Sequence, residues 1–245
     1  MVERRGTVAT VSGPSVFELR DVVAGPTADP ILRDVSVSIP AEGITVLAGP
    51  SGGGKSTLLR LLNRLDDPIS GEISWKGTSL DEWDPTELRR QVAMIFQQPP
   101  LFEGTVRDNL CVASPDVSDD RALHVLDHVD LAPELIDRDA SLLSGGEAQR
   151  MCVARALLTD PDVVLADEPT AALDTAARHT VEDLARKLAA SGVALVWVTH
   201  DTDQLRRLAD HVGTVVDGRL TAFGHLEELS ESADPTVRRL VGAGQ

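Results

Sequence analysis

Apolar residues follow two different spacings along the chain. Residues 16–23, 31–39 and 71–77 partly alternate between apolar and polar positions and are separated by turn residues, which predicts an antiparallel β flank. Three continuous apolar runs, ITVLAG at 44–49, DVVLADE at 162–168 and GVALVWVTH at 192–200, are typical of parallel strands covered on both faces. STLLRLLNRL at 56–65 has helical periodicity. This alternation predicts an α/β fold.

The pattern changes between Gln97 and Arg150. Prolines stand at positions 99, 100, 115 and 133, and the apolar residues then follow helical spacing around 121–129 and 148–158. We therefore expect one domain over residues 16–245, with a core of about 16–97 and 151–223 and a helical subdomain of about 98–150. Residues 1–15 are expected to be a flexible tail, and the segment after Gly218 is too short for a further domain.

Composition fits a globular protein that needs no disulfides. The 245 residues are 42% hydrophobic, which allows a substantial core. Cys111 and Cys152 lack metal-ligand spacing and are interpreted as structural, as in a reducing compartment. The start has no apolar signal region, and no run of about 18 apolar residues occurs. These features predict a cytoplasmic protein.

Charge narrows the range of partners. The net charge is −16, which argues against nucleic acid as a ligand, because its phosphates require basic patches. Only three lysines stand against twenty arginines. This balance indicates either adaptation to high salt, in a possible halophile, or an ordinary acidic protein from a GC-rich genome.

A glycine-rich stretch, GPSGGGKST, follows the predicted strand at 44–49 and opens the predicted helix. This context is typical of a phosphate-binding G-x-x-x-x-G-K-[ST] loop, in which backbone amides surround phosphate oxygens. Lys55 would reach the β- and γ-phosphates, and the Ser56 hydroxyl would ligate Mg²⁺. The residues of this loop are Gly49, Pro50, Ser51, Gly52, Gly53, Gly54, Lys55, Ser56 and Thr57.

Two adjacent carboxylates end the apolar run at 162–168. Asp167 is placed to hold Mg²⁺ through water, and Glu168 to orient and polarise the attacking water. The alternative is that both acids only cap the segment that follows. Pro169 makes this second interpretation weaker, because it fixes the exit of the chain.

The stretch LLSGGEAQR at 142–150 has two interpretations. Ser144 and Glu147 have the spacing of a capping box, which by itself only starts a helix. Gly145 and Gly146 would leave backbone N–H groups bare at the positive end of a helix dipole, where anions bind.

Five motifs together resemble one known family. GPSGGGKST, FQQ, LSGGEAQR, VVLADEPTAALD and WVTHD occur in the order and approximate spacing of the ATP-binding cassette (ABC) ATPases. The resemblance covers about residues 16 to 223. It implies a P-loop NTPase (RecA-like) core with an antiparallel β flank and an inserted α-helical subdomain, which binds and hydrolyses ATP with Mg²⁺.

The resemblance also implies roles for single residues. The serine and two glycines at 144–146 would contact the γ-phosphate of ATP bound to another subunit. Gln97 would ligate Mg²⁺, Asp174 would cross the dimer interface, and His200 would contact the γ-phosphate and the catalytic water. Function would then require a dimer, either a homodimer or a heterodimer with a like cassette, that ATP closes.

A transport role is the function that the resemblance implies first. The chain would be the ATPase subunit of an ABC transporter, peripheral on the inner face of the cell membrane through separate permease subunits, in some systems with a solute-binding protein. Phosphate, another inorganic ion or a metal would be the cargo. The alternative is a soluble ABC ATPase in iron–sulfur cluster assembly or another non-transport role.

Two segments leave alternatives open. Residues 22–30 lack the aromatic residue that stacks on adenine in most of the family, which leaves Val23 or Pro26 as weaker apolar contacts and base selectivity undecided. Leu101 and Phe102, in QQPPLFEGTVRDNL, would either form an apolar docking surface for the permease or pack inside the helical subdomain.

Overall fold

The computed structural model describes residues 13–98 and 100–242. The chain forms two compact units: the first runs to Asp84 and resumes at Val198, and the second is Pro85–Trp197. Most of the tail expected at 1–15, residues 1–12, lies outside the described residues. Within the described ranges, no helix combines the length and apolar character needed to cross a bilayer.

The first unit contains the antiparallel flank that the sequence predicts. Its strand order is β2-β1-β4-β5, and the β1 pairings with β2 and β4 are antiparallel. Phe17 of β1 lies opposite Ile39 and Trp75 on the neighbouring strands. Paired residues point to the same face of a sheet, and all three side chains are buried on that face. The four strands are β1 (Ser15–Ala24), β2 (Leu32–Pro40), β4 (Ser70–Trp75) and β5 (Thr78–Ser79), followed by a 3₁₀ turn at Leu80–Glu82.

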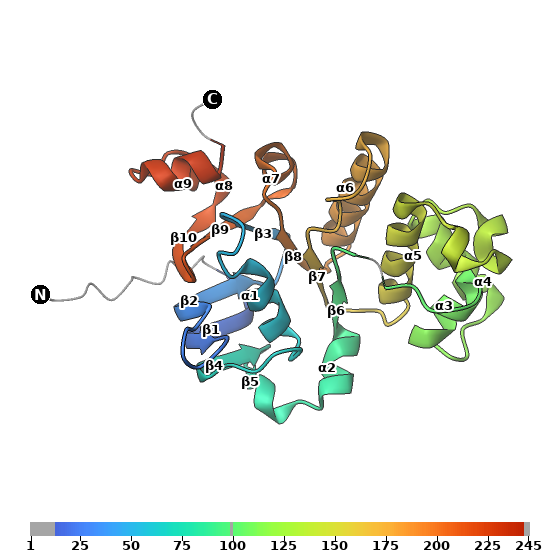
Figure 1. The fold of residues 1–245 in the computed structure, drawn as a ribbon, viewed down its shortest axis with the longest axis horizontal. Helices are drawn as coiled ribbons and strands as arrows, with labels where there is room; N and C mark the ends of the chain where they lie inside the picture. Colours follow the sequence, from blue (N-terminus) through green and yellow to red (C-terminus); the bar gives the residue numbers. More distant parts are fainter. Residues whose placement is uncertain (1–12, 99, 243–245) are drawn as a thin grey trace, which may run out of the picture. The chain divides into compact units, whose positions relative to one another are not determined.

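The same unit holds the strand that leads into the glycine-rich loop. β3 (Ile44–Ala48) is buried at all five positions and pairs in parallel with β9 (His211–Val216), which pairs antiparallel with β10 (Arg219–His225). Helix α1 (Lys55–Leu62) follows the loop, and α7 (Thr202–Leu208) packs on β3. The short helices α8 (Leu226–Ser230) and α9 (Pro235–Leu240) lie at the β10 side (Figure 1).

The second unit contains a parallel pair of strands flanked by helices. β6 (Val92–Ile95) and β7 (Val163–Asp167) run parallel, with β8 (Ala194–Val198) next to β7 and ending where the first unit resumes. Helix α2 (Pro85–Gln91) leads into β6, and α6 (Thr175–Ala190) connects β7 to β8. The apolar runs at 162–168 and 192–200 therefore form strands, as their burial pattern requires.

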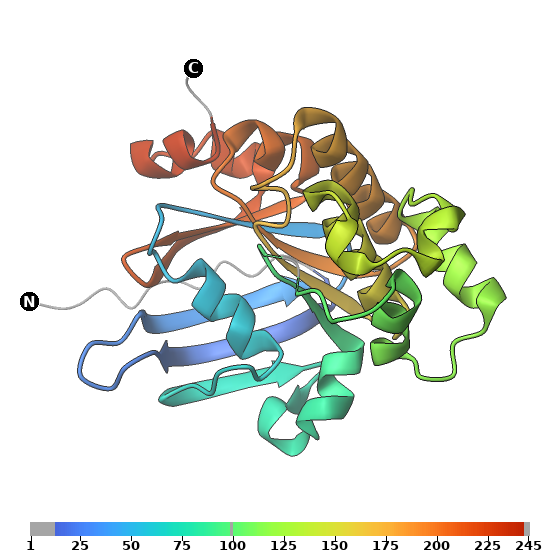
Figure 2. The same ribbon diagram turned by 45° about the vertical axis from the view of Figure 1, so that its right-hand side comes forward.

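The segment between β6 and β7 is helical, as the sequence predicts. Helices α3 (Val106–Ala113), α4 (Asp119–His128) and α5 (Gly145–Leu157) pack together, with 3₁₀ turns at Pro133–Asp137 and Ala140–Leu142 between α4 and α5 (Figure 2). Leu110, Leu126 and Met151, one from each helix, are fully buried. The α5 helix begins at its two glycines, three residues before the apolar pattern predicts.

Two histidines lie opposite each other at the ends of β9 and β10. The rings of His211 and His225 are 4.5 Å apart, and the His211 side chain is 8% exposed. The pKa of His211 lies below its ordinary value because burial disfavours the charged ring and because His225 would repel it. Asp210 and Glu228 act in the opposite direction without reversing the shift. Folding therefore favours the neutral form of the His211 ring.

This shift predicts a pH dependence of stability. The unfolded chain protonates His211 more readily than the folded chain, so the stability that the neutral ring contributes is present above the unfolded pKa and is lost as pH falls through the lower folded pKa. We expect the free energy of unfolding, measured by urea titration, to fall between about pH 7.5 and pH 5.5.

The His211→Phe variant should show a smaller pH dependence, because phenylalanine does not titrate. The substitution breaks no hydrogen bond at Nδ1, since this buried atom has no partner among the described residues. His179→Phe, which replaces an exposed histidine of α6, is the matched control and should keep the wild-type slope. Equal slopes in all three proteins would contradict this assignment.

Candidate functional site

The glycine-rich loop has the geometry of a phosphate-binding site. Among the described residues no side chain caps the start of α1, whose first turn has no acidic residue. No carboxylate of α1 itself therefore competes with a bound anion at this helix end. Lys55 is buried, and its Nζ donates to the carbonyl oxygens of Gly49 and Pro50, both at 2.9 Å. A buried amine and a helix start without a side-chain cap, together in one loop, suit a triphosphate.

Gly49 shows why this loop requires glycine. Its φ of +151° lies in the region that favours glycine, and a Cβ there would lie 2.0 Å from the carbonyl oxygen of Val215. Val215 belongs to β9, the parallel neighbour of β3. The loop thus leaves the strand pair along a path that only a residue without a side chain can take.

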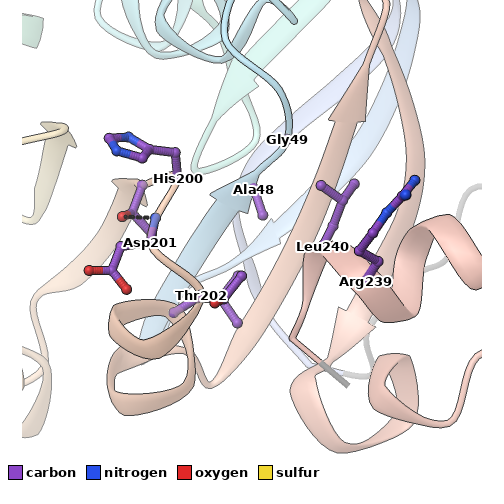
Figure 3. A pocket seen from close by; sticks show the side chains of 9 residues that line it. Ala48, Gly49, His200, Asp201, Thr202, Arg239 and Leu240 are labelled. Carbon is purple, nitrogen blue, oxygen red and sulfur yellow. Dashed lines mark hydrogen bonds between the residues drawn. The ribbon is translucent and has the colours of Figure 1, made fainter. Parts of the chain in front are cut away.

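His200 lies beside the same loop. It follows β8 and precedes α7, whose N-cap Asp201 accepts from the N–H groups of Asp203 and Gln204. His200 and Gly49 border one small pocket of about 70 Å³, with Arg239 and Leu240 of α9 on another side (Figure 3). The exposed His200 ring extends away from Leu240. The first unit therefore brings the predicted histidine to the beginning of the phosphate loop.

The second unit brings together three further predicted residues. Asp167 ends β7, Glu168 follows it, and the Gln97 side-chain N–H donates to Glu168 Oε2 at 3.5 Å, a long contact. Glu168 has a φ of +45°, which is unusual for a residue with a side chain. Such backbone strain gathers at functional sites, because the surrounding structure must hold it in place.

The signature segment forms the capping box that its sequence predicts. Ser144 Oγ accepts from the Glu147 N–H at 3.3 Å, and Glu147 Oε2 accepts from the Ser144 N–H at 2.8 Å. The pKa of Glu147 is lowered chiefly by that backbone donor. Gly145 and Gly146 form the first turn of α5, and a Cβ at Gly145 would meet nothing within 4 Å among the described residues. The structure is compatible with both interpretations of this segment, the helix cap and the anion site.

Asp174 has a structural role in addition to the expected one. It is the N-cap of α6, where its carboxylate accepts from the Ala177 N–H at 2.9 Å. The residue is exposed, so the side chain is accessible on the surface of the second unit.

Three polar residues that hold the segment between β6 and α3 are not predicted from the sequence. Asn109 is fully buried in α3, Gln149 of α5 is 1% exposed, and Arg155 lies near the end of α5; all three bond to backbone groups of the segment between β6 and α3. Ile31 is 41% exposed, and a Cβ at Gly54 would lie 3.4 Å from its side chain. Ile31 therefore offers an apolar surface next to the phosphate loop. The sequence had suggested only Val23 or Pro26 as apolar contacts for adenine. A buried asparagine within a helical pattern is the one local signal that could have been noticed.

The apolar segment after Gln97 is at the surface of its unit. Leu101 is 38% exposed and Phe102 is 48% exposed. Both residues are therefore partly exposed and partly packed within their unit, which is compatible with a docking surface and with packing in the helical subdomain. Pro99, part of the same stretch, lies outside the described residues.

A phosphate loop after a buried parallel strand, together with an acidic pair at the end of another strand, defines a P-loop ATPase. The family profile described as "ABC transporter" matches residues 32–171. The chain therefore belongs to the ABC transporter family and is an ATP-hydrolysing cassette that uses ATP and Mg²⁺.

Named relatives agree with this assignment. The rice (Oryza sativa subsp. japonica) protein STAR1 is 40% identical over 86% of this chain, which spans 62% of the length of the rice protein. The phosphate import ATP-binding protein PstB of Thermotoga maritima is 35% identical over 82% of this chain and 86% of its own length. PstB 3 of Natronomonas pharaonis is 37% identical over 83% of this chain and 77% of its own length.

Solved structures show the same fold. A nucleotide-free ATP-binding cassette from an ABC transporter has a TM-score of 0.82 and 25% identity, covering 93% of this chain and 98% of that one. A cassette solved as a dimer in a post-hydrolysis state with ADP and Pi has a TM-score of 0.74 and 29% identity, covering 85% and 98%. The α/β fold with its helical insertion is thus confirmed.

The capping box yields a prediction about stability. Ser144→Ala removes the acceptor for the Glu147 N–H and should lower the free energy of unfolding by about 0.5–2 kcal/mol in urea titration. Ser144→Asp is the matched control, because aspartate restores an N-cap acceptor and should recover most of that loss. Equal stability of Ser144→Ala and wild type would show that the cap is not needed.

Proposed function

We propose that this cassette drives transport of a small inorganic ion through separate membrane subunits, with phosphate the favoured cargo. The observation that carries the proposal is the likeness to two phosphate import ATP-binding proteins over more than four fifths of this chain. The cassette itself does not contact cargo in this proposal, so the membrane partner determines what is carried.

The phosphate loop, residues 49–57, binds the triphosphate in this proposal. Its backbone N–H groups and the end of α1 surround the phosphate oxygens. Lys55 then exchanges the carbonyl oxygens of Gly49 and Pro50 for the β- and γ-phosphates, where its charge offsets the charge that develops during transfer. Thr57, next to Ser56, completes the start of the helix.

Three polar side chains are proposed to hold the metal ion: the Ser56 hydroxyl, the Gln97 amide oxygen and, through water, Asp167. Mg²⁺ prefers oxygen ligands and completes its shell with water and substrate phosphates, so a small set of protein ligands suits it. When bound, Mg²⁺ neutralises phosphate charge at the transferring group.

Glu168 and His200 are proposed to position the attacking water. Glu168 orients and polarises the water, and its positive φ and its long contact with Gln97 support this role. His200 donates to the γ-phosphate and holds the water in line. Catalysis then rests mainly on positioning and charge stabilisation.

The signature segment is proposed to act on a second copy. Ser144, Gly145 and Gly146 bind the γ-phosphate held by the phosphate loop of the other subunit, and Asp174 crosses the interface. A capped helix whose first turn has no Cβ in the way presents its N–H groups to an anion. ATP therefore closes a homodimer, or a heterodimer with a like cassette, and hydrolysis opens it.

The permease is proposed to dock on Leu101 and Phe102, which places the cassette on the cytoplasmic face of the cell membrane. The partial exposure of both side chains supports this docking surface. An importer of this kind would also use a solute-binding protein. No nucleic-acid partner is proposed, because the chain carries a net charge of −16.

The role of Glu168 predicts a separation of binding from hydrolysis. Glu168→Gln keeps the shape of the side chain but cannot polarise water as a carboxylate does, so the rate of ATP hydrolysis should fall by about 100-fold or more. The variant should still bind Mg·ATP and remain dimeric by size-exclusion chromatography. Glu134→Gln, an exposed position with the same loss of charge, should hydrolyse ATP at the wild-type rate. Wild-type hydrolysis by Glu168→Gln would reject the proposed role.

The transport proposal is tested by what the closed dimer binds. Tagged Glu168→Gln protein with Mg·ATP is used to purify partners from detergent-solubilised host membranes in the salt of the host, and these are identified by mass spectrometry. We expect a polytopic membrane protein whose identity points to the cargo. Purification of soluble partners alone, while other membrane complexes stay intact, would favour the iron–sulfur assembly role instead.

A further inference from the structure

The segment around Gln97 is bonded to helix α5 at two points. Gln149 Nε2 donates to the Phe96 carbonyl oxygen at 3.2 Å, and Arg155 Nη2 donates to the Pro100 carbonyl oxygen at 2.9 Å. These donors lie six residues apart, which is about 9 Å along a helix at 1.5 Å per residue. Residues 96–100, which include Gln97, are therefore bonded to α5 at both ends.

Arg155 extends this connection to the exposed apolar residues. Its guanidinium carbon lies 4.8 Å from the centre of the Phe102 ring, a cation–π contact, and Nη1 donates to Asn109 Oδ1 at 3.3 Å. The planar guanidinium thus contacts the backbone of Pro100, the ring of Phe102 and the side chain of Asn109 at once. A lysine could not make this set of contacts, because its donors surround a single nitrogen.

Asn109 fixes the backbone of Phe102. Its Oδ1 accepts from the Phe102 N–H at 2.9 Å, and its Nδ2 donates to the Phe102 and Thr105 carbonyl oxygens at 2.9 and 3.0 Å. Asn109 is fully buried, so these bonds are shielded from water. Phe102 is therefore held on its backbone by α3 and on its ring by α5, while 48% of the residue stays exposed.

We propose that Arg155 is a positioning residue that transmits displacement of the signature helix to the docking surface at Leu101 and Phe102. One end of α5 begins at Ser144, the proposed contact for ATP on another subunit, and its last turn carries Arg155. Dimer closure that moves the start of α5 then moves the apolar pair with it. This inference rests on the proposed function, because it needs ATP to act at Ser144.

The test measures amide hydrogen exchange by mass spectrometry in the Glu168→Gln protein, with and without Mg·ATP. ATP should slow exchange in a peptide containing Ser144–Glu147 and also, by about threefold or more, in a peptide containing Leu101–Gly104. Arg155→Met on the same background should keep the ATP response at Ser144–Glu147 and lose most of the response at Leu101–Gly104. Arg155→Lys should give an intermediate response.

Arg121→Met is the matched control. It removes an arginine from α4 that pairs with Asp160, and it should leave both ATP responses unchanged. ATP hydrolysis by Arg155→Met in a wild-type background should stay within about twofold of wild type, because Arg155 contacts none of the proposed catalytic residues and the Gln149 bond to Phe96, next to Gln97, is kept.

The outcomes separate this inference from the function on which it rests. No ATP response at Ser144–Glu147 in the parent protein would contradict the closed dimer. A response there without one at Leu101–Gly104 in the parent protein, or an undiminished response at Leu101–Gly104 in Arg155→Met, would overturn the role of Arg155 alone. If Arg155→Met does not fold, as circular dichroism would show, a full response in Arg155→Lys would overturn it equally.

Discussion

The close approach of the phosphate loop to β9 is the constraint on which the nucleotide site depends. Gly49 leaves β3 where a Cβ would lie 2.0 Å from the Val215 carbonyl oxygen, so only glycine fits at this turn. Lys55 is buried against the carbonyl oxygens of this turn. The buried strand pair therefore determines where the proposed triphosphate site lies within the first unit.

Helix α5 has two different environments at its opposite ends, and the proposals give each end its own role. Its first turn begins with two glycines after the Ser144 cap, which suits contact with an anion. Its buried face, which includes Met151, belongs to the core of the helical insertion. Its last turn is bonded through Arg155 to the segment that carries Phe102. One helix thus connects the proposed nucleotide contact at Ser144 to the surface at Phe102.

Local patterns in the sequence were sufficient for several of the strands and helices and for the motifs that identify the family. The phosphate loop, the acidic pair at 167–168 and the capping box at Ser144 each depend on neighbours within a few residues, so their spacing is readable directly. Apolar runs likewise predicted β3, β7 and β8, because a strand buried on both faces needs apolar residues throughout. The sequence by itself therefore determined the fold class and the family.

Tertiary structure alone decided which distant groups meet. Gln97 contacts Glu168, and Arg155 bonds to Pro100, although both pairs are far apart in the chain. The +45° φ of Glu168 is likewise not predictable from the residue type. The exposure of Phe102 also depends on how α3 and α5 pack around it. A local sequence pattern reflects the burial and capping of one helix or strand. These contacts instead arise from the packing of several elements against each other.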